Sequence, residues 1–147
     1  MTIALFLHLI SDVVWVGGMF LAYVCVRPAA VEALEPPQRL KLWTGIFRRF
    51  FPWVWAAVIV ILGSGFAMMG KMGAVPHYVI AMAVIGVVMS MIFMHIYFAP
   101  FARLKRAVAA EDWKAGGAAL NQIRILVGTN LALGVINIAV ATLGQGL

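Results

Sequence analysis

The chain has 147 residues, of which 65% are apolar and 11% are charged. A soluble domain carries about 45–50% apolar and roughly 25% charged residues, so this composition excludes an ordinary cytosolic enzyme and a disordered tail. The single cysteine, Cys25, excludes a disulfide scaffold. In a soluble protein the net charge of +6 would suggest binding to nucleic acid. In so apolar a chain, the basic residues are first expected to mark the cytoplasmic side of a membrane protein. The length predicts one domain over residues 1–147.

Four apolar segments are long enough to cross a bilayer, which takes about 20 helical residues. They are residues 3–26, 51–70, 78–99 and 122–144. The first lacks the basic start of a cleaved secretory signal, so we expect it to be retained as a span. Backbone groups in lipid must be satisfied within each segment, so the spans are predicted to be helices. The predicted fold is an all-α, integral-membrane four-helix up-down bundle.

The basic residues predict the orientation of this bundle. Two predicted loops, residues 27–50 and 101–124, each hold five of the eleven lysines and arginines. The positive-inside rule places both loops in the cytoplasm and both termini outside, in the periplasm, for a multi-pass protein of the bacterial inner membrane. Topology thus explains the net charge. The predicted partner is the lipid bilayer, and no nucleic-acid partner is expected.

Helix-breaking residues indicate where the loops begin and end. Pro28, Pro36 and Pro37 are expected to interrupt the first loop, and Pro52 is placed where it can open the second span. In the second loop, after Pro100, we expect a helical extension, then Glu111-Asp112, and then a break at Gly116-Gly117. Tryptophans such as Trp43 are expected at the inner membrane boundary, where amphipathic rings are favoured.

The first span carries a polar stripe. His8, Asp12, Trp15 and Met19 are spaced by four, three and four residues, which places them on one helix face. Ionisable residues within a span are energetically costly and mark functional sites by default. The functional interpretation is a ligand or proton site built on His8 and Asp12. The structural alternative is a His–Asp hydrogen bond near the outer interface that only holds this helix in place.

Two further spans add candidates. His95 shares a face of the third span with Met91 and Met94. At about 1.5 Å per residue, His8 lies near the level of Ser64 while His95 lies roughly 15 Å further along the membrane normal, so the two cannot bind one small ion. The same separation also fits poorly with His8 and His95 as the two axial ligands of one haem whose plane stands upright in the bilayer. Residues expected to support a polar interior together with these histidines are Asp12, Trp15, Arg124, Asn130 and Asn137.

Sulfur ligands gather at the predicted outer loop, where three methionines lie close to His77. Thioethers and imidazoles suit Cu(I) better than hard cations. The alternative is that methionines in so apolar a chain fill gaps in the packing. The soft-ligand candidates are Met19, Met68, Met69, Met72, Met91 and Met94.

The run from Leu7 to Pro28, with His8-Leu9, Trp15-Val16-Gly17-Gly18-Met19-Phe20 and Arg27-Pro28, resembles the first helix of the CopD-type copper resistance membrane domain. Later stretches look like a short stand-alone branch of the same superfamily: Arg48-Arg49-Phe50-Phe51-Pro52-Trp53-Val54-Trp55, His95-Ile96-Tyr97-Phe98-Ala99-Pro100 and Asn121-Gln122-Ile123-Arg124. For the CopD branch, the resemblance implies copper uptake or tolerance across the inner membrane.

That superfamily also takes in the HemJ-type protoporphyrinogen oxidases, which are similar four-helix membrane proteins that bind haem. This resemblance implies a ligand role for His8 and for His77 at the start of the third span. HemJ-type sequences carry a lysine two residues after the second histidine, and here that position is Val79. The departure argues against oxidase activity and leaves haem binding open.

Three hypotheses follow from the sequence. The leading one is a CopD-like protein that binds copper or carries it across the inner membrane, with metal-ligand candidates His8 on the outer side, His95 on the inner side, and His77. The alternative is a haem b redox protein, which as an enzyme would be a haem-dependent membrane oxidoreductase; enzymatic activity is not favoured. The third is a non-catalytic membrane assembly subunit. Copper ion and haem b both stay open as cofactors, and a homo-oligomer is compatible with the sequence.

Overall fold

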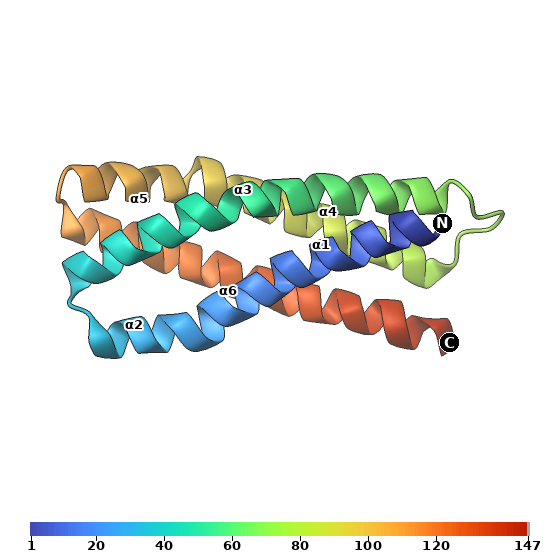
Figure 1. Cartoon of the computed structure of the whole chain (residues 1–147), viewed down its shortest axis with the longest axis horizontal. Helices are drawn as coiled ribbons and strands as arrows, with labels where there is room; N and C mark the ends of the chain where they lie inside the picture. The colour runs from blue at the N-terminus through green and yellow to red at the C-terminus, as the bar shows by residue number, and fades with distance from the viewer. Residues whose placement is uncertain (147) are drawn as a thin grey trace.

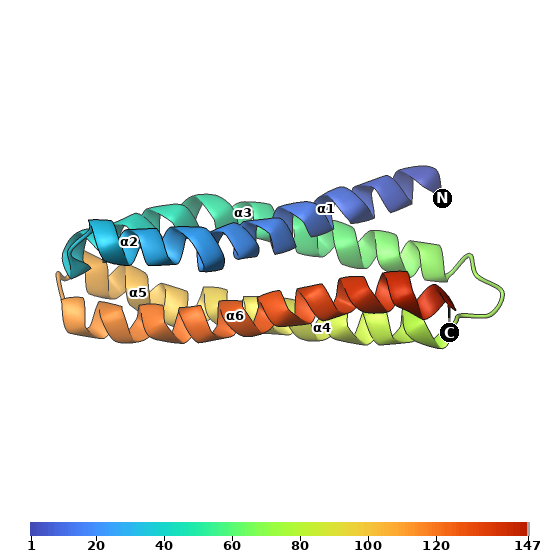
Figure 2. The ribbon, with the colours of Figure 1, turned by 90° about the horizontal axis from the view of Figure 1, so that it is seen from below.

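The computed structural model describes residues 1–146 and consists of helices joined by short connections. Four helical units are long and apolar enough to cross a membrane: Thr2–Ala33, Pro36–Met69, His77–Ala109 and Trp113–Gly146. They lie side by side in an elongated bundle (Figures 1 and 2). The two chain ends and the loop of residues 70–76 lie at one end, here called the terminal end. The α2–α3 and α5–α6 connections lie at the other, here called the basic end (Figure 1).

The first unit is continuous although it contains a change of helix type. It comprises α1 (Thr2–Phe20), the π-helix η1 (Leu21–Val26) and α2 (Arg27–Ala33). A π-turn closes i→i+5 hydrogen bonds and is often found at functional sites. The prediction that Pro28 interrupts a loop here is wrong, since the helical unit runs through Pro28 to Ala33.

The second unit is the single helix α3 (Pro36–Met69), which contradicts the prediction that Pro52 opens a span. Pro52 lies inside this helix and removes only the N–H that would bond to the carbonyl of residue 48. The helix extends far into the region predicted as a loop because its apolar residues keep the helical period. Leu40, Trp43 and Phe47 are all buried, at spacings of three and four residues.

The third unit divides at a proline. Its first helix, α4 (His77–Phe98), agrees with the predicted span 78–99 to within one residue at each end. Pro100 opens α5 (Pro100–Ala109), and Ala99 before it leaves the helical region, as the residue preceding a proline tends to do.

The fourth unit is α6 (Trp113–Leu143), followed by the short 3-10 helix η2 (Gly144–Gly146). The Asp112 side chain caps α6 by accepting a hydrogen bond from the Ala115 N–H at 3.1 Å. The predicted break at Gly116-Gly117 is wrong, since α6 runs through both glycines. An added Cβ at Gly116 would lie 3.1 Å from Leu40 Cδ1, so this glycine allows α3 and α6 to approach closely.

The predicted long basic loops, residues 27–50 and 101–124, are therefore mostly helical. The connections at the basic end are reduced to residues 34–35 and 110–112. The helices continue beyond the predicted spans because these regions are amphipathic: basic side chains lie on one face and apolar side chains are buried on the other. The buried members of α5 are Pro100, Phe101, Leu104 and Ala107.

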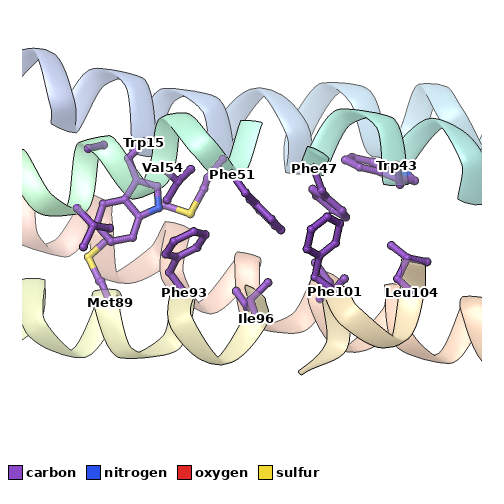
Figure 3. Packing of buried hydrophobic residues seen from close by; sticks show 14 of the residues in the cluster. Trp15, Trp43, Phe47, Phe51, Val54, Met89, Phe93, Ile96, Phe101 and Leu104 are labelled. Atoms are coloured by element: carbon purple, nitrogen blue, oxygen red, sulfur yellow. The ribbon is translucent and has the colours of Figure 1, made fainter. Parts of the chain in front are cut away.

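An aromatic core occupies the centre of the bundle (Figure 3). Phe51 is its hub, with ring centroids 4.9 Å from Phe47, 4.9 Å from Phe101 and 5.4 Å from Phe93. Trp43 extends this row by stacking on Phe47 at 5.3 Å. It is therefore part of the core and lies on the same face of α3 as Phe47.

Candidate functional site

His8 is fixed across the contact between α1 and α3. Its Nδ1 atom lies 3.1 Å from the carbonyl oxygen of Ile61 and 3.0 Å from the hydroxyl oxygen of Ser64. The predicted level of His8 near Ser64 is thereby confirmed. Gly65 makes room for the ring, since an added Cβ there would lie 3.3 Å from His8 Cε1. A small polar residue and a glycine thus form a seat for the imidazole.

These two contacts favour the tautomer that carries the proton on Nδ1. A carbonyl oxygen only accepts hydrogen bonds, so His8 Nδ1 must donate to Ile61. The Ser64 hydroxyl already donates to the Val60 carbonyl, so it too accepts from Nδ1. In the neutral imidazole, Nε2 then has no proton and keeps its lone pair. A metal-binding histidine usually has this arrangement, with its other ring N–H held by a carbonyl or similar acceptor.

The rest of the stripe on the first unit lies toward the bundle. Trp15 and Met19 are each only 3% exposed, and Ser11 is also buried. Asp12, one turn after His8, is half-buried, as is His8 itself. The imidazole, the carboxylate and the thioether of Met19 therefore follow one another along the inward side of α1.

The other two histidines lie elsewhere. His77 is the first residue of α4 and is exposed at the terminal end. His95 is exposed too, together with Met91 and Met94 on the same helix. The expectation that His95 belongs to the polar interior is wrong, because α4 turns Phe93 and Ile96 inward at this level and so places His95 on the outer surface. Met68 and Met69 at the end of α3 and Met72 in the 70–76 loop are half-buried.

Asn130 forms a polar point inside the core. It is 1% exposed, and its Nδ2 donates to the Met89 carbonyl at 3.0 Å. Its Oδ1 atom is buried without a hydrogen-bond partner, as is Oδ1 of Asn137. Asn130 also lines a small cavity of about 20 Å³ together with Trp15 and Met19. This volume is enough for one water molecule or one small ion.

A second and larger cavity lies toward the basic end, between the first unit, α3 and α6. Its volume is about 290 Å³, and Arg27, Arg39 and Arg124 contribute to its walls. The sequence singled out only Arg124. Arg39 was missed because its contact with the cavity arises only once the presumed loop folds as part of α3.

Neither cavity suits a haem held by histidine, because none of the three histidines lines either one. Within residues 1–146 there is also no group of three or more His, Cys, Asp or Glu side chains placed to hold one metal ion together. A copper ion at His8 would therefore draw its remaining ligands from other donor types, such as thioethers, amide oxygens or water.

Comparison with protein families supports the first of the two resemblances. The family model described as copper resistance protein D (CopD) matches residues 44–143. The chain belongs to the CopD family. The match begins within α3 and extends to the end of α6, so α1, which carries His8, lies before it. Comparison of this CopD-family chain with curated proteins and with solved structures gives no match.

Proposed function

We propose that this CopD-family protein binds copper inside the membrane and takes part in copper uptake across the bacterial inner membrane. The copper ion is the cargo. The observation that carries the proposal is the hydrogen bond from His8 Nδ1 to the Ile61 carbonyl, which leaves Nε2 available as a ligand. Family membership supports the choice of copper as the metal.

The proposed orientation follows the positive-inside rule. Ten of the eleven basic residues fall in residues 27–50 and 101–124, and these regions meet at the basic end of the bundle. The basic end then faces the cytoplasm, and the terminal end, with both chain termini, faces the periplasm. His8 would therefore meet copper arriving from outside.

A second weak contact point is proposed deeper in the bundle. Met19 is 11 residues beyond His8, which on a helix corresponds to roughly 16 Å. Met19 and Asn130 both line the 20 Å³ cavity. Two weak sites suit transfer better than one tight site, because an ion must leave as well as enter. The imidazole and the thioether are both soft enough for Cu(I).

The proposal is tested by copper accumulation in cells that lack the gene and are complemented from a plasmid. Wild-type protein should raise cellular copper under limiting external copper, and His8→Ala at equal membrane abundance should not. His95→Ala is the matched control, because it removes an exposed histidine from the same bundle. Equal accumulation with wild type and His8→Ala would contradict the proposal.

A further inference from the structure

The larger cavity gathers positive charge without a matching negative charge. Arg27, Arg39 and Arg124 line it, and no aspartate or glutamate is among its lining residues. The Nε atoms of Arg39 and Arg124 are buried and have no hydrogen-bond partner. A buried N–H of a guanidinium group without a partner is unfavourable, since its lost hydration is not replaced. The cavity therefore fits an anion with several acceptor oxygens.

The same cavity has a large apolar wall. Trp43, Trp113 and Leu40 line it close to the arginines, and Phe47 and Val127 extend it toward the middle of the bundle. Phe47 and Val127 also border the small central cavity, so the apolar part reaches the core of the protein. A small hydrophilic anion would leave most of this wall uncovered. A ligand with an anionic head and an apolar tail matches both parts.

The first unit forms one wall of this cavity. Arg27 follows directly after η1, and its guanidinium lies 5.3 Å from the ring centroid of Tyr23 within η1. Tyr23 in turn packs on α6 at Gly128, where an added Cβ would lie 2.9 Å from the ring. The π-turn thus holds one arginine at the cavity while α2 stands apart from α6 at the basic end (Figure 1).

We propose that this cavity binds an anionic phospholipid, with its phosphate held by Arg27, Arg39 and Arg124 and one acyl chain along the Trp43 wall. Guanidinium groups bind phosphate oxygens through paired, charge-assisted hydrogen bonds. Basic pockets between transmembrane helices bind anionic headgroups in this way on the side where such lipids are abundant. The site is separate from the copper site proposed at His8.

The first test measures the thermal unfolding midpoint of the full-length protein in neutral detergent. Phosphatidylglycerol should raise the midpoint more than equimolar phosphatidylcholine. In the double variant Arg39→Gln/Arg124→Gln the apparent affinity for phosphatidylglycerol should fall about tenfold or more. The matched control is Arg48→Gln/Arg106→Gln, which removes the same charge from exposed positions at the same end and should behave like wild type.

Two outcomes would overturn the proposal. Equal loss of affinity in both double variants would show that the lipid responds only to net charge. An equal rise of the midpoint with inorganic phosphate alone would assign the site to a soluble anion.

A second measurement needs no variant: native mass spectrometry of the wild-type protein should show phosphatidylglycerol retained in preference to phosphatidylcholine. Equal retention of the two lipids would contradict the assignment.

Discussion

The imidazole of His8, near the start of α1, lies 3.0 Å from the hydroxyl of Ser64, near the end of α3. Together with the Ile61 carbonyl, this contact fixes the ring across the helix–helix boundary and directs its proton to Nδ1. The copper hypothesis rests on this arrangement, because it makes Nε2 available without any rearrangement of the fold.

Ser64→Ala separates the two contacts of His8. The Ile61 carbonyl still accepts from Nδ1 in this variant, so the ring should keep its protonation state. We expect copper affinity to fall by about tenfold or less, at the lower end of the effect of losing an outer hydrogen bond to a metal-binding histidine. Competition with a Cu(I) chelator measures this. A loss as large as that of His8→Ala would contradict the expectation that the Ile61 carbonyl alone keeps the ring in place.

The neighbouring glycines Gly17 and Gly18 provide a matched pair for the packing of α1 on α3. A Cβ at Gly18 would lie 2.4 Å from the Phe50 ring, whereas nothing lies within 4 Å of one at Gly17. Gly18→Ala should lower the free energy of unfolding by about 1–3 kcal/mol through overpacking. Gly17→Ala should leave it unchanged or raise it by up to about 1 kcal/mol through helix propensity. Chemical denaturation in detergent measures both, and equal effects would contradict the packing.

Substitutions of Asn130 test the polar point in the core. Asn130→Leu removes the bond to the Met89 carbonyl but also the unpartnered Oδ1, so the free energy of unfolding should change by no more than about 1 kcal/mol. Asn130→Asp places an acceptor against the Met89 carbonyl, which is also an acceptor, and should lower the free energy of unfolding by about 2 kcal/mol or more. If the leucine variant were the less stable of the two, Oδ1 would have a partner that the structure does not include.

Cysteine labelling tests the proposed orientation. In a Cys25→Ser background, Ala74→Cys introduces a thiol in the 70–76 loop, and Glu111→Cys introduces one in the α5–α6 connection; both positions are exposed. A membrane-impermeant maleimide added to spheroplasts should label the thiol at position 74 and not the one at 111. Permeabilised cells provide the control, since both thiols should then react. The reverse pattern would place the basic end outside.

The spans could be predicted because each needs a long apolar run, and α4 was located to within one residue at each end. The helical extensions at the basic end could not be predicted in this way. The length of a span is predicted from its apolar run, and the residues around Arg39 and Arg48 are amphipathic instead. The helical period of their apolar residues is present in the sequence, but only tertiary packing shows that Leu40 and Leu104 are buried.

The candidate site was only partly predictable. The spacing of His8, Asp12, Trp15 and Met19 defines a helix face, and burial of Trp15 and Met19 agrees with an inward direction for it. The partner that fixes His8 is a backbone carbonyl, which has no signature in a sequence. For His95, helical spacing identified its neighbours Met91 and Met94 but not the side of α4 that faces the bundle. That side is set by the aromatic packing around Phe93.

The most direct test of the central hypothesis is a Cu(I) titration of the purified protein against a chromophoric competitor, comparing wild type with His8→Ala, His77→Ala and His95→Ala. The two exposed histidines serve as controls, because neither of them contacts Ile61 or Ser64 as His8 does. We predict that His8→Ala lowers copper affinity by at least about tenfold, while His77→Ala and His95→Ala bind like wild type. Unchanged binding in His8→Ala would contradict the assignment of His8 as a copper ligand.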